Sequence, residues 1–371
     1  MATAPKQVLM LMPGCEVRGS TVQALTLAQG LPASGYAATV LCRDASQVAP
    51  DKREGVRFLE RASIGWSMAM PIVRHFLARE LDSSPPAVIH AQHRCLLPLA
   101  RWLSVRWRCP VVLSVHDYLN PGESLCWDQT CPSAIVSVSE SVRDDLLSRA
   151  SLKPDSVHVI HGGVAVPDPG APSTVLDPRH APVIGTAGPL EAAKGLKYFL
   201  AAAPIILREQ PLAQFLIAGA GPEERNLRRL ARDLGVNSSV TFVPSLSDFS
   251  VSLDAMDVYV LPSLKQGLGT IMLEAMARAI PVIATSSGGV YAVVNDGTTG
   301  MLVPPSDSQS LAQRIMELIR DPLRARAIGE NARDMVQTEF PISRMIEDTV
   351  ALYERVVTSL PGGGVAHFRL Q

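Results

Sequence analysis

Two successive series of short apolar runs, each alternating with helical or turn-forming segments, constrain the fold of this chain most strongly. The first series opens with the run 7–12, which a turn-rich stretch and a helical pattern over 20–33 follow. Further apolar runs lie at 38–41, 87–90, 111–115, 134–138 and 157–160. Because strands joined by helix-length connections pair in parallel, this alternation predicts an α/β fold with a doubly wound sheet.

The same plan recurs after a proline-rich connector. Five prolines within residues 166–182 disfavour a long helix there and favour an extended linker. Beyond the connector, strands are expected at 183–186, 214–218, 239–243, 258–261, 281–285 and 300–303. The helical stretches are 197–209, 223–234, 271–279 and 308–319. A second doubly wound sheet is therefore predicted.

The length of 371 residues also favours two domains, since single cores seldom grow that large. We predict an N-terminal Rossmann-like domain over 1–167, a linker over 168–182 and a C-terminal Rossmann-like domain over 183–342. Residues 343–371 should contain a helix that packs back towards the first domain, followed by a tail. Two such domains would face each other across a cleft, where ligands bind in open α/β folds.

Composition argues against several other classes of protein. A hydrophobic content of 47% with only 5% aromatic residues suits buried parallel strands covered by helices. A formal net charge of −1 lacks the basic excess that duplex nucleic acid requires, so nucleic acid is not an expected partner. No apolar stretch approaches bilayer-spanning length, and the short run 8–12 does not resemble a secretory signal, which indicates a cytoplasmic protein.

The six cysteines lie in the N-terminal half without the spacing of a zinc ribbon, and in a reducing compartment we expect free thiols. Cys126 and Cys131 are close enough to form half of a metal site, but no second pair completes it. The sequence also has no Asp-x-Asp pair to hold a divalent ion. No metal is therefore expected.

The richest local signal lies in residues 262–277. A predicted strand delivers the chain into a glycine turn, and a helix starts at about Gly269, so the free amides of its first turn point at whatever lies in front. Such a helix start binds phosphate through its N–H groups and its dipole together. Glu274 follows Thr270 by one turn on the same face, where a carboxylate can accept hydrogen bonds from ribose hydroxyls. From spacing alone, an ordinary surface helix with a glutamate near its N-terminus remains the alternative.

Further motifs follow in order, and together they are more specific than a lone glycine turn. Within residues 261–307 stand Glu274-Ala275-Met276-Ala277, Pro281-Val282-Ile283-Ala284-Thr285, Gly288-Gly289, Asn295-Asp296-Gly297 and Gly300-Met301-Leu302-Val303-Pro304-Pro305. This stretch resembles the donor-site signature of the retaining GT-B glycosyltransferases of family four. The likeness extends over nearly the whole chain, through 138–140, 188–190, 194–195 and 219–222. It implies two facing Rossmann-like domains and a nucleoside-diphosphate sugar as donor.

The resemblance assigns donor-binding roles by position. Lys194 matches the lysine that contacts the donor diphosphate, where its charge would neutralise the leaving group. Without the resemblance, Lys194 would pass as a solvated helix lysine. Glu274 matches the family's ribose ligand. The loop that binds the sugar hydroxyls and the diphosphate through its backbone corresponds to Gly267, Leu268, Gly269, Thr270 and Ile271.

In the first domain the resemblance assigns two positions. Gly19 lies in the glycine loop that approaches the phosphates, although Ser20 stands where the family usually has a second glycine. His116, at the end of a predicted strand, matches the histidine beside the transferred sugar at the reaction centre. A satisfied histidine at a loop start is the alternative. His90 and His93, near another strand end, are further candidates for the acceptor side.

Two positions depart from the family's pattern. Gln266 stands where the family typically has a glutamate; its amide can bond a sugar hydroxyl but lacks the negative charge that favours positive charge at the anomeric carbon. Pro189 replaces the family's arginine and cannot donate a hydrogen bond. Lys265 or Lys197 is a candidate replacement for that cation. The implied catalytic residues are then His116, Lys194 and Gln266.

The implied reaction transfers a sugar, with retention at the anomeric carbon, to a hydroxyl of a glycan, lipid-linked or small-molecule acceptor. We expect a metal-independent, hexosyltransferase-type enzyme that needs no cofactor, the nucleotide sugar being a co-substrate. Since no two carboxylates stand out as a double-displacement pair, front-side attack is favoured, with domain closure gating turnover. Two other functions remain open: a catalytically weakened nucleotide-sugar-binding protein on the same scaffold, motivated by Gln266 and Pro189, and a nucleotide-sugar epimerase of the same architecture.

Arginines and aromatic residues are interleaved in the N-terminal domain. Together they would form a basic-aromatic face for anionic lipid, composed of Arg74, Arg79, Arg94, Arg101, Trp102, Leu103, Arg106, Trp107 and Arg108. A core-packing amphipathic helix with a solvated arginine face is the alternative. Peripheral membrane contact through this domain is thus one of two interpretations of the segment.

Overall fold

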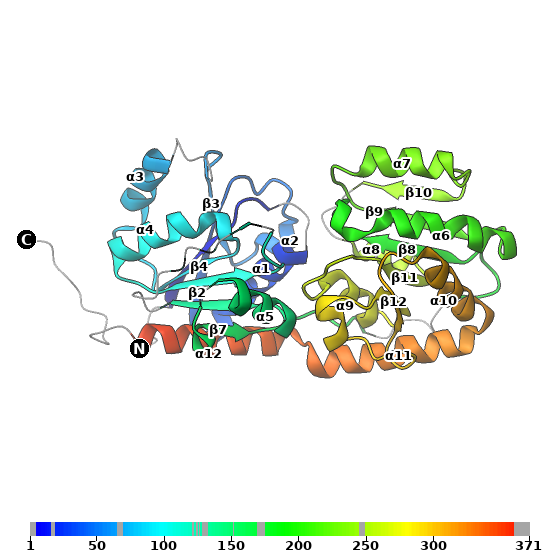
Figure 1. Ribbon diagram of the computed structural model, residues 1–371. Helices are drawn as coiled ribbons and strands as arrows, with labels where there is room; N and C mark the ends of the chain where they lie inside the picture. Colours follow the sequence, from blue (N-terminus) through cyan, green and yellow to red (C-terminus); the bar gives the residue numbers. More distant parts are fainter. Residues whose placement is uncertain are drawn as a thin grey trace, which may run out of the picture. The chain divides into compact units, whose positions relative to one another are not determined.

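A computed structural model describes residues 5–15, 19–64, 70–120, 122, 123, 125, 127, 133–150, 152–168, 175–244 and 249–359. The chain divides into two compact units (Figure 1). Met1–Glu16, Ser20–Ile160 and Ser343–Gln371 make up the first unit, and Val17–Gly19 with His161–Ile342 the second. Cys126, Cys131, residues 169–174 of the predicted linker and the predicted tail from residue 360 lie outside the described residues.

Seven parallel strands form the sheet of the first unit, in the order β3-β2-β1-β4-β5-β6-β7. Their bounds are β1 Lys6–Leu11, β2 Tyr36–Cys42, β3 Arg57–Glu60, β4 Val88–Ala91, β5 Val111–Val115, β6 Ser133–Ser137 and β7 Val157–Val159. In register, Met10 of β1 pairs with Val40 of β2 on one side and with His90 of β4 on the other. The strand order therefore reverses at β1, and ligands of open α/β sheets bind beyond the carboxyl ends of the strands at such a point.

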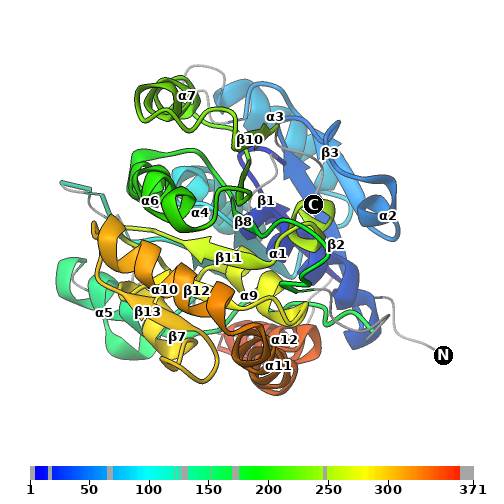
Figure 2. The ribbon, with the colours of Figure 1, turned by 90° about the vertical axis from the view of Figure 1, so that its right-hand side faces the viewer.

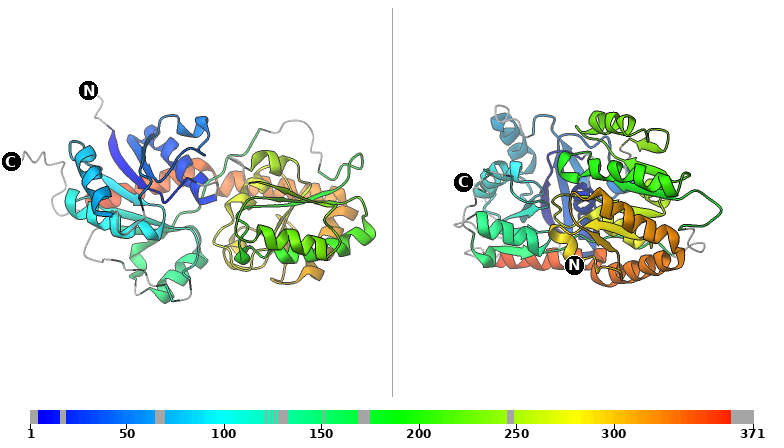
Figure 3. Two further views of the ribbon diagram at one scale, coloured as in Figure 1. Left: turned by 90° about the horizontal axis from the view of Figure 1, so that it is seen from above. Right: turned by 45° about the vertical axis from the view of Figure 1, so that its right-hand side comes forward.

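The helices of the first unit are α1 Gly19–Gly30, α2 Pro50–Arg53, α3 Met70–Leu81, α4 Leu97–Trp107, α5 Glu140–Arg149 and α12 Ile342–Thr358. Strands β4 and β5 are buried along their whole length, as expected of a parallel sheet covered on both faces. The last helix, α12, lies along this sheet, where Tyr353 contacts His90 (Figures 1 and 3). A segment from the far end of the sequence thus completes the first unit.

Six parallel strands form the sheet of the second unit, in the order β10-β9-β8-β11-β12-β13. Their bounds are β8 Val183–Ala187, β9 Gln214–Ala218, β10 Val240–Val243, β11 Val258–Leu261, β12 Val282–Thr285 and β13 Met301–Val303. The helices are α6 Leu196–Glu209, α7 Glu224–Asp233, α8 Ser250–Asp254, α9 Thr270–Ala277, α10 Ser308–Arg320 and α11 Pro322–Glu339. Helix α6 packs against α10, and α9 against α11 (Figure 2). The predicted doubly wound α/β fold is confirmed in both units.

The second unit begins at His161, ahead of the predicted linker. The backbone N–H of Val164 donates to Phe340 O at 3.0 Å, and the ring of His161 packs on that of Phe340. A Cβ at Gly163 would lie 2.6 Å from the Cα of Ile342, so only glycine permits this approach. The segment 161–164 is therefore packed against residues 340–342 within the second unit.

The helix expected over 20–33 is shorter than predicted. Helix α1 ends at Gly30, and the chain continues as a 3-10 turn, Leu31–Ser34, that closes at Gly35 with a φ of 76°. Pro32 explains the change, because it has no N–H to continue the α-helical hydrogen-bond ladder. The helix expected over 271–279 likewise ends early, at Ala277, before Ala279 adopts a φ of 56°.

Candidate functional site

The start of α9 has the geometry of an anion-binding helix terminus. Gly269 is the N-cap residue with a φ of 91°, and no side chain caps the first amides of the helix. Leu268 and Ile271 are buried on either side of the turn and hold it against the core. The N–H groups of the first turn are therefore fixed in place without a side-chain partner, as phosphate binding at a helix start requires.

Lys194 lies beside this turn because two loops approach very closely. Gly195 has a φ of 63°, and a Cβ on it would lie 2.0 Å from the carbonyl oxygen of Pro262. The backbone N–H of Leu264 donates to Ala193 O at 2.9 Å. This packing fixes the short 3-10 turn that ends at Lys194 against the loop that leads to α9.

Lys194 and Gln266, predicted from separate motifs, are in direct contact. Lys194 Nζ donates to Gln266 Oε1 at 3.2 Å, and Ser263 Oγ donates to the same oxygen at 3.1 Å. The backbone carbonyl oxygen of Gln266 accepts a hydrogen bond from the backbone N–H of Gly289 at 3.0 Å. Gln266 is thus held by both side chain and backbone, with the ammonium group of Lys194 against its amide oxygen.

Glu274 occupies one of the two partly open positions of α9. Thr270 and Glu274 are half-buried, whereas the other residues of the helix are buried. They are separated by one helical turn and lie on the same face. Glu274 therefore lies on the same side of α9 as Thr270, the first residue of the helix.

The loop that contains Pro189 is fixed by two glycines. Gly188 has a φ of 139° and Gly219 a φ of 145°, and a Cβ on Gly219 would lie 1.9 Å from Gly188 O. The N–H of Leu190 donates to Ala220 O at 2.9 Å, so the loops after β8 and β9 are joined. A Cβ on Gly188 would lie 3.4 Å from Ile271 Cδ1, which places this loop against the start of α9.

The two lysines suggested as replacements for the arginine are both exposed. Lys197 Nζ lies 4.9 Å from the centroid of the Tyr198 ring, its neighbour on α6. That contact gives Lys197 a partner of its own. Compensation for Pro189 by either lysine stays a prediction.

His116 directly follows β5 in the first unit, and burial makes it a weak base. The side chain is half-buried, and its Nε2 atom is buried with no hydrogen-bond partner within the described part of the chain. Burial lowers the pKa of His116 to about 4, with the charge of Asp117 opposing the shift. The imidazole is therefore neutral at pH 7 and has a ring nitrogen available for a hydrogen bond.

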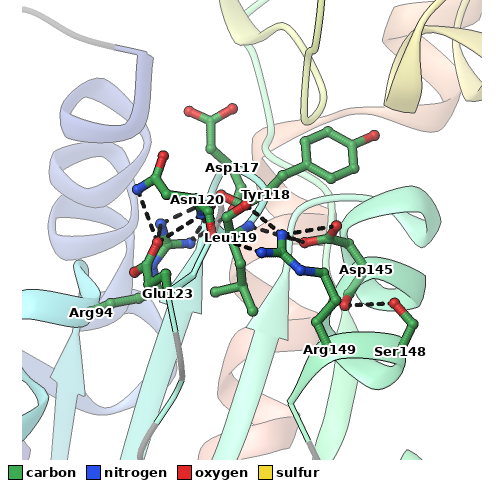
Figure 4. A network of polar contacts seen from close by, with 9 residues as sticks. All are labelled: Arg94, Asp117, Tyr118, Leu119, Asn120, Glu123, Asp145, Ser148 and Arg149. Atoms are coloured by element: carbon green, nitrogen blue, oxygen red, sulfur yellow. Dashed lines mark hydrogen bonds and ion pairs between the residues drawn. The ribbon is translucent and has the colours of Figure 1, made fainter.

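The segment 117–120 after His116 is clamped from two sides (Figure 4). From β4's side, Arg94 Nη1 donates to Asp117 O at 2.9 Å and the guanidinium pairs with Glu123 at 2.8 Å. From α5, Asp145 accepts from the N–H of Leu119 at 2.9 Å. Arg149, also on α5, donates to Leu119 O at 2.5 Å and to Asn120 O at 2.6 Å.

This clamp changes the interpretation of Arg94. The sequence grouped Arg94 with the basic-aromatic face, but its side chain is only 15% exposed and is engaged by Glu123 and by backbone carbonyls. In the first unit Arg94 binds the backbone of the segment after His116. The backbone position of His116 is fixed as a result.

His90 and His93 lie near enough to His116 to lower pKa values by charge repulsion, but both have hydrogen-bond partners of their own. His90 is 2% exposed and uses both ring nitrogens, Nδ1 at 2.6 Å from Tyr353 Oη and Nε2 at 2.8 Å from Ser114 Oγ. His93 is exposed and accepts the N–H of Cys95 at its Nδ1. His90 is therefore part of the packing between β4, β5 and α12, and His93 caps a 3-10 turn.

Sequence reasoning missed Gln92, which directly follows β4. Its N–H donates to Leu11 O at the end of β1, so it stands where the strand order of the first sheet reverses. The side chain is 7% exposed, and its Nε2 has no hydrogen-bond partner among the residues that the structure describes. A buried amide without a partner is costly, which makes it a candidate ligand contact. Its position after a predicted strand was the only available signal.

The two remaining glycines of the predicted donor site lie at helix starts. Gly19 begins α1 and is half-buried, while Gly267 is buried in the turn before α9.

Within the described residues, no cluster of three or more His, Cys, Asp or Glu side chains is arranged to hold a metal ion. Cys15, Cys42, Cys95 and Cys109 are free thiols. Among the helices described, none is both long and apolar enough to cross a bilayer.

Two parallel-sheet units, one with an uncapped glycine-led helix start beside a lysine, have the architecture of the GT-B fold. Sequence comparison agrees: the family described as "Glycosyl transferases group 1" matches residues 175–335, and "Glycosyltransferase Family 4" matches residues 17–166. The chain belongs to the GT-B glycosyltransferases of family four.

Curated relatives match parts of the chain. The alpha-D-kanosaminyltransferase of Streptomyces kanamyceticus is 28% identical over 60% of this chain and 61% of its own length. The alpha-maltose-1-phosphate synthase of Mycolicibacterium smegmatis is 31% identical over 60% of this chain and 63% of its own. A GDP-mannose-dependent monoacylated alpha-(1-6)-phosphatidylinositol monomannoside mannosyltransferase of Corynebacterium glutamicum is 37% identical over 43% of each chain. The chain thus spans less than two thirds of the length of these relatives.

Solved structures match the fold over nearly the whole chain. Anabaena HepE, determined in complex with UDP and glucose, superposes with a TM-score of 0.79 at 18% identity, covering 94% of this chain and 100% of that one. The sucrose-phosphate synthase of Thermosynechococcus elongatus superposes with a TM-score of 0.75 at 20% identity, covering 95% and 100%. At these identities the likeness establishes the fold.

Proposed function

We propose that this protein is a retaining glycosyltransferase that moves a sugar from a nucleoside-diphosphate sugar to a hydroxyl of a glycan, lipid-linked or small-molecule acceptor. The observation that carries the proposal is the 3.2 Å contact between Lys194 Nζ and Gln266 Oε1 beside the uncapped start of α9. An ammonium group and free helix amides together suit a diphosphate. Glu274, on the same helix, suits the ribose.

Stabilisation of the leaving group is the main catalytic task that these residues can perform. As the bond to the diphosphate breaks, negative charge grows on the phosphate oxygens, and Lys194 with the helix amides would stabilise it without a metal. Gln266 would donate its amide N–H to a sugar hydroxyl. We propose front-side attack, in which a diphosphate oxygen helps to take the proton of the acceptor hydroxyl. His116, neutral at pH 7, would contact the transferred sugar.

Relatives and structural neighbours support a nucleotide-sugar donor. HepE was solved with UDP and glucose, and the Corynebacterium relative is named as GDP-mannose-dependent. The name of that relative also includes a monoacylated phosphatidylinositol monomannoside, which supports a lipid-linked acceptor as one of the proposed classes. Action in the cytoplasm, with peripheral contact of the first unit with a membrane, belongs to the same proposal.

A second candidate function is a nucleotide-sugar-binding protein with weakened catalysis. It is favoured by Gln266, which offers an amide where the family has a carboxylate, and by Pro189, which offers no donor where the family has an arginine. Losing one charged partner typically weakens binding or transition-state stabilisation by a few kcal/mol. Such a protein would bind the donor and turn it over slowly or not at all.

Calorimetric titration with a panel of nucleoside diphosphates and their sugars tests the proposal. We expect one diphosphate to bind, and Lys194→Ala and Glu274→Ala to weaken it at least tenfold. The exposed residues Lys153 and Glu347 supply matched controls, Lys153→Ala and Glu347→Ala, which should bind as the wild type does. Binding followed by transfer supports the enzyme, and binding without turnover supports the second function. No binding by any member of the panel would contradict both.

A further inference from the structure

The exposed apolar side chains of the first unit are gathered on two neighbouring helices. Among the described residues, the large apolar side chains that are exposed in this unit are Ile72 and Phe76 of α3 and Val105 of α4, with exposed fractions of 60%, 52% and 77%. Helices α3 and α4 pack against each other (Figure 1). The α3–α4 surface, as we call the exposed faces of these two helices, is therefore unusual within its unit.

On each helix, the face opposite the buried one carries exposed apolar and basic side chains. On α3, Ile72, Phe76 and Arg79 share one exposed face, while Val73 and Leu77 are buried on the other. A helix packed on one side only would normally be polar on its outer face. Among the described residues, nothing in the unit covers the apolar groups on this outer face.

On α4 the outer face combines one apolar residue with two cations. Arg101, Val105 and Arg108 are exposed and spaced by about one turn, whereas Leu99, Ala100 and Leu103 are buried. Leu103, which the sequence grouped with the basic-aromatic face, is therefore a core residue. The outer face of α4 carries no acidic side chain.

One cation–π contact joins the two helices, and a second lies within α4. The guanidinium of Arg74 on α3 lies 5.3 Å from the ring centroid of Trp102 on α4, and that of Arg106 lies 5.9 Å from the same centroid. Trp107 Nε1 donates to Asp82 at 2.8 Å, just after the end of α3, and Arg106 pairs with the same carboxylate. The arrangement of the exposed groups is thereby fixed before any partner binds.

The charge of the α3–α4 surface is positive. Glu80, the acidic residue within the two helices, is engaged by Arg57 at 3.1 Å and Arg61 at 2.7 Å, and Asp82 is engaged by Arg106 and Trp107. No acid is paired with Arg79 or Arg108 among the described residues. Apolar side chains standing between unpaired arginines match an interface of acyl chains beneath anionic headgroups.

We propose that the α3–α4 surface docks on a membrane that contains anionic phospholipid. Ile72, Phe76 and Val105 enter the headgroup–acyl boundary, and Arg79 and Arg108 contact lipid phosphates. The binding is peripheral and reversible, and it weakens with ionic strength because the arginines contribute by screened attraction. The docking deepens the peripheral membrane contact named under the proposed function, and its link to a lipid-linked acceptor rests on that function.

Co-sedimentation of the full chain with vesicles tests the proposal. We expect the protein to sediment with vesicles of phosphatidylcholine and phosphatidylglycerol at low salt, to stay in solution with phosphatidylcholine alone, and to be released by high salt. Phe76→Glu and Arg79→Glu should each lower the bound fraction several-fold. Leu212→Glu and Leu323→Glu are matched controls in the second unit, where the native side chains are 72% and 77% exposed, and should bind as the wild type does.

Failure of this inference can be told apart from failure of the proposed function. Because the four substitutions are at exposed positions, thermal unfolding should show all variants folded, and calorimetry should show their nucleotide binding unchanged. If the wild type stays in solution with anionic vesicles, or if the α3–α4 variants sediment as it does, the docking surface is wrong. Vesicle binding without nucleotide binding would instead contradict the proposed function alone.

Discussion

At the scale of single residues, the donor site depends on backbone conformations that only glycine adopts easily. Gly195 is the clearest case: its φ is 63°, and a Cβ on it would lie 2.0 Å from Pro262 O, so the packing that brings Lys194 to Gln266 requires glycine. Any side chain there would meet backbone rather than a flexible neighbour. The position of the Lys194 ammonium group therefore depends on having glycine as the next residue.

Gly195→Ala should lower the free energy of unfolding by more than the roughly 1 kcal/mol that a left-handed alanine costs, because the new Cβ must also displace the Pro262 loop. Gly235→Ala is the matched control: its φ is 70°, but no atom lies within 4 Å of the added Cβ. Urea unfolding should show a clearly larger loss for Gly195→Ala, together with weaker binding of the diphosphate. Equal losses would contradict the steric argument.

Substitution of Gln92 should impair function without lowering the stability of the protein. Its amide nitrogen is buried without a partner among the described residues, so Gln92→Leu, similar in volume, should leave the free energy of unfolding unchanged or raise it by about 1 kcal/mol. If the amide binds substrate, the same change should lower transfer at least tenfold while donor binding persists. Normal transfer by the variant would show that Gln92 contacts no ligand, and a loss of stability in urea unfolding would contradict the argument from the unpartnered nitrogen.

At the scale of elements, the strands were predictable because a buried parallel strand is mostly apolar, as β5 and β11 are. Among the elements that were missed, β3 and α11 have clear physical reasons. Strand β3 lies at the edge of its sheet, and only Leu59 of its four residues is buried, so its pattern is weak. Helix α11 begins with Pro322, a residue usually taken as a helix breaker but tolerated in the first turn.

The candidate site was only partly predictable. The ordered motifs identified Lys194, Gln266 and Glu274, but the contact between Lys194 and Gln266 joins positions 72 residues apart and depends on how two loops pack. Gln92 could not be distinguished from a surface glutamine, because burial without a partner is a property of the folded unit. Arg94 was assigned to the wrong surface for the same reason, since its partner Glu123 lies in a loop.

The docking of α12 on the first sheet should depend on its hydrogen bond to β4. Tyr353→Phe removes the partner of His90 Nδ1, which would then be buried without a hydrogen bond at a cost of about 1–3 kcal/mol. Tyr291→Phe, at a position that is 63% exposed, is the control and should have no effect on unfolding. Equal stability of the two variants in urea would show that the bond is not needed.

Burial of His90 should also make the free energy of unfolding of the first unit depend on pH. Burial lowers the pKa of His90 to about 3 from an ordinary value of 6.5, so between these values the unfolded chain binds a proton that the folded unit excludes. Stability should therefore fall as the pH falls from about 6.5 towards about 3. His90→Gln, whatever its stability at pH 7, should show a shallower fall in urea unfolding across this range. An unchanged slope would contradict the argument.

At the scale of the whole molecule, the C-terminal helix belongs to the unit at the other end of the sequence. Met345, Leu352, Tyr353 and Val356 of α12 are buried within the first unit, while the second unit ends at Ile342. The first unit is therefore incomplete until the whole chain has been made. The second unit has its own contiguous core, with Phe199 packed on Phe215.

A chain that ends at residue 341 should therefore lose the fold of the first unit and keep that of the second. All 4 tryptophans precede residue 161, so intrinsic fluorescence reports on the first unit alone, while circular dichroism reports on both. We expect the truncated chain to have the fluorescence of an unfolded unit, yet to retain a cooperative transition by circular dichroism and to bind the diphosphate. A chain that ends at residue 359, which keeps α12, should behave as the full chain does. Native fluorescence in the shorter chain would mean that the first sheet is stable without α12, and loss of the remaining transition would mean that the second unit depends on the first.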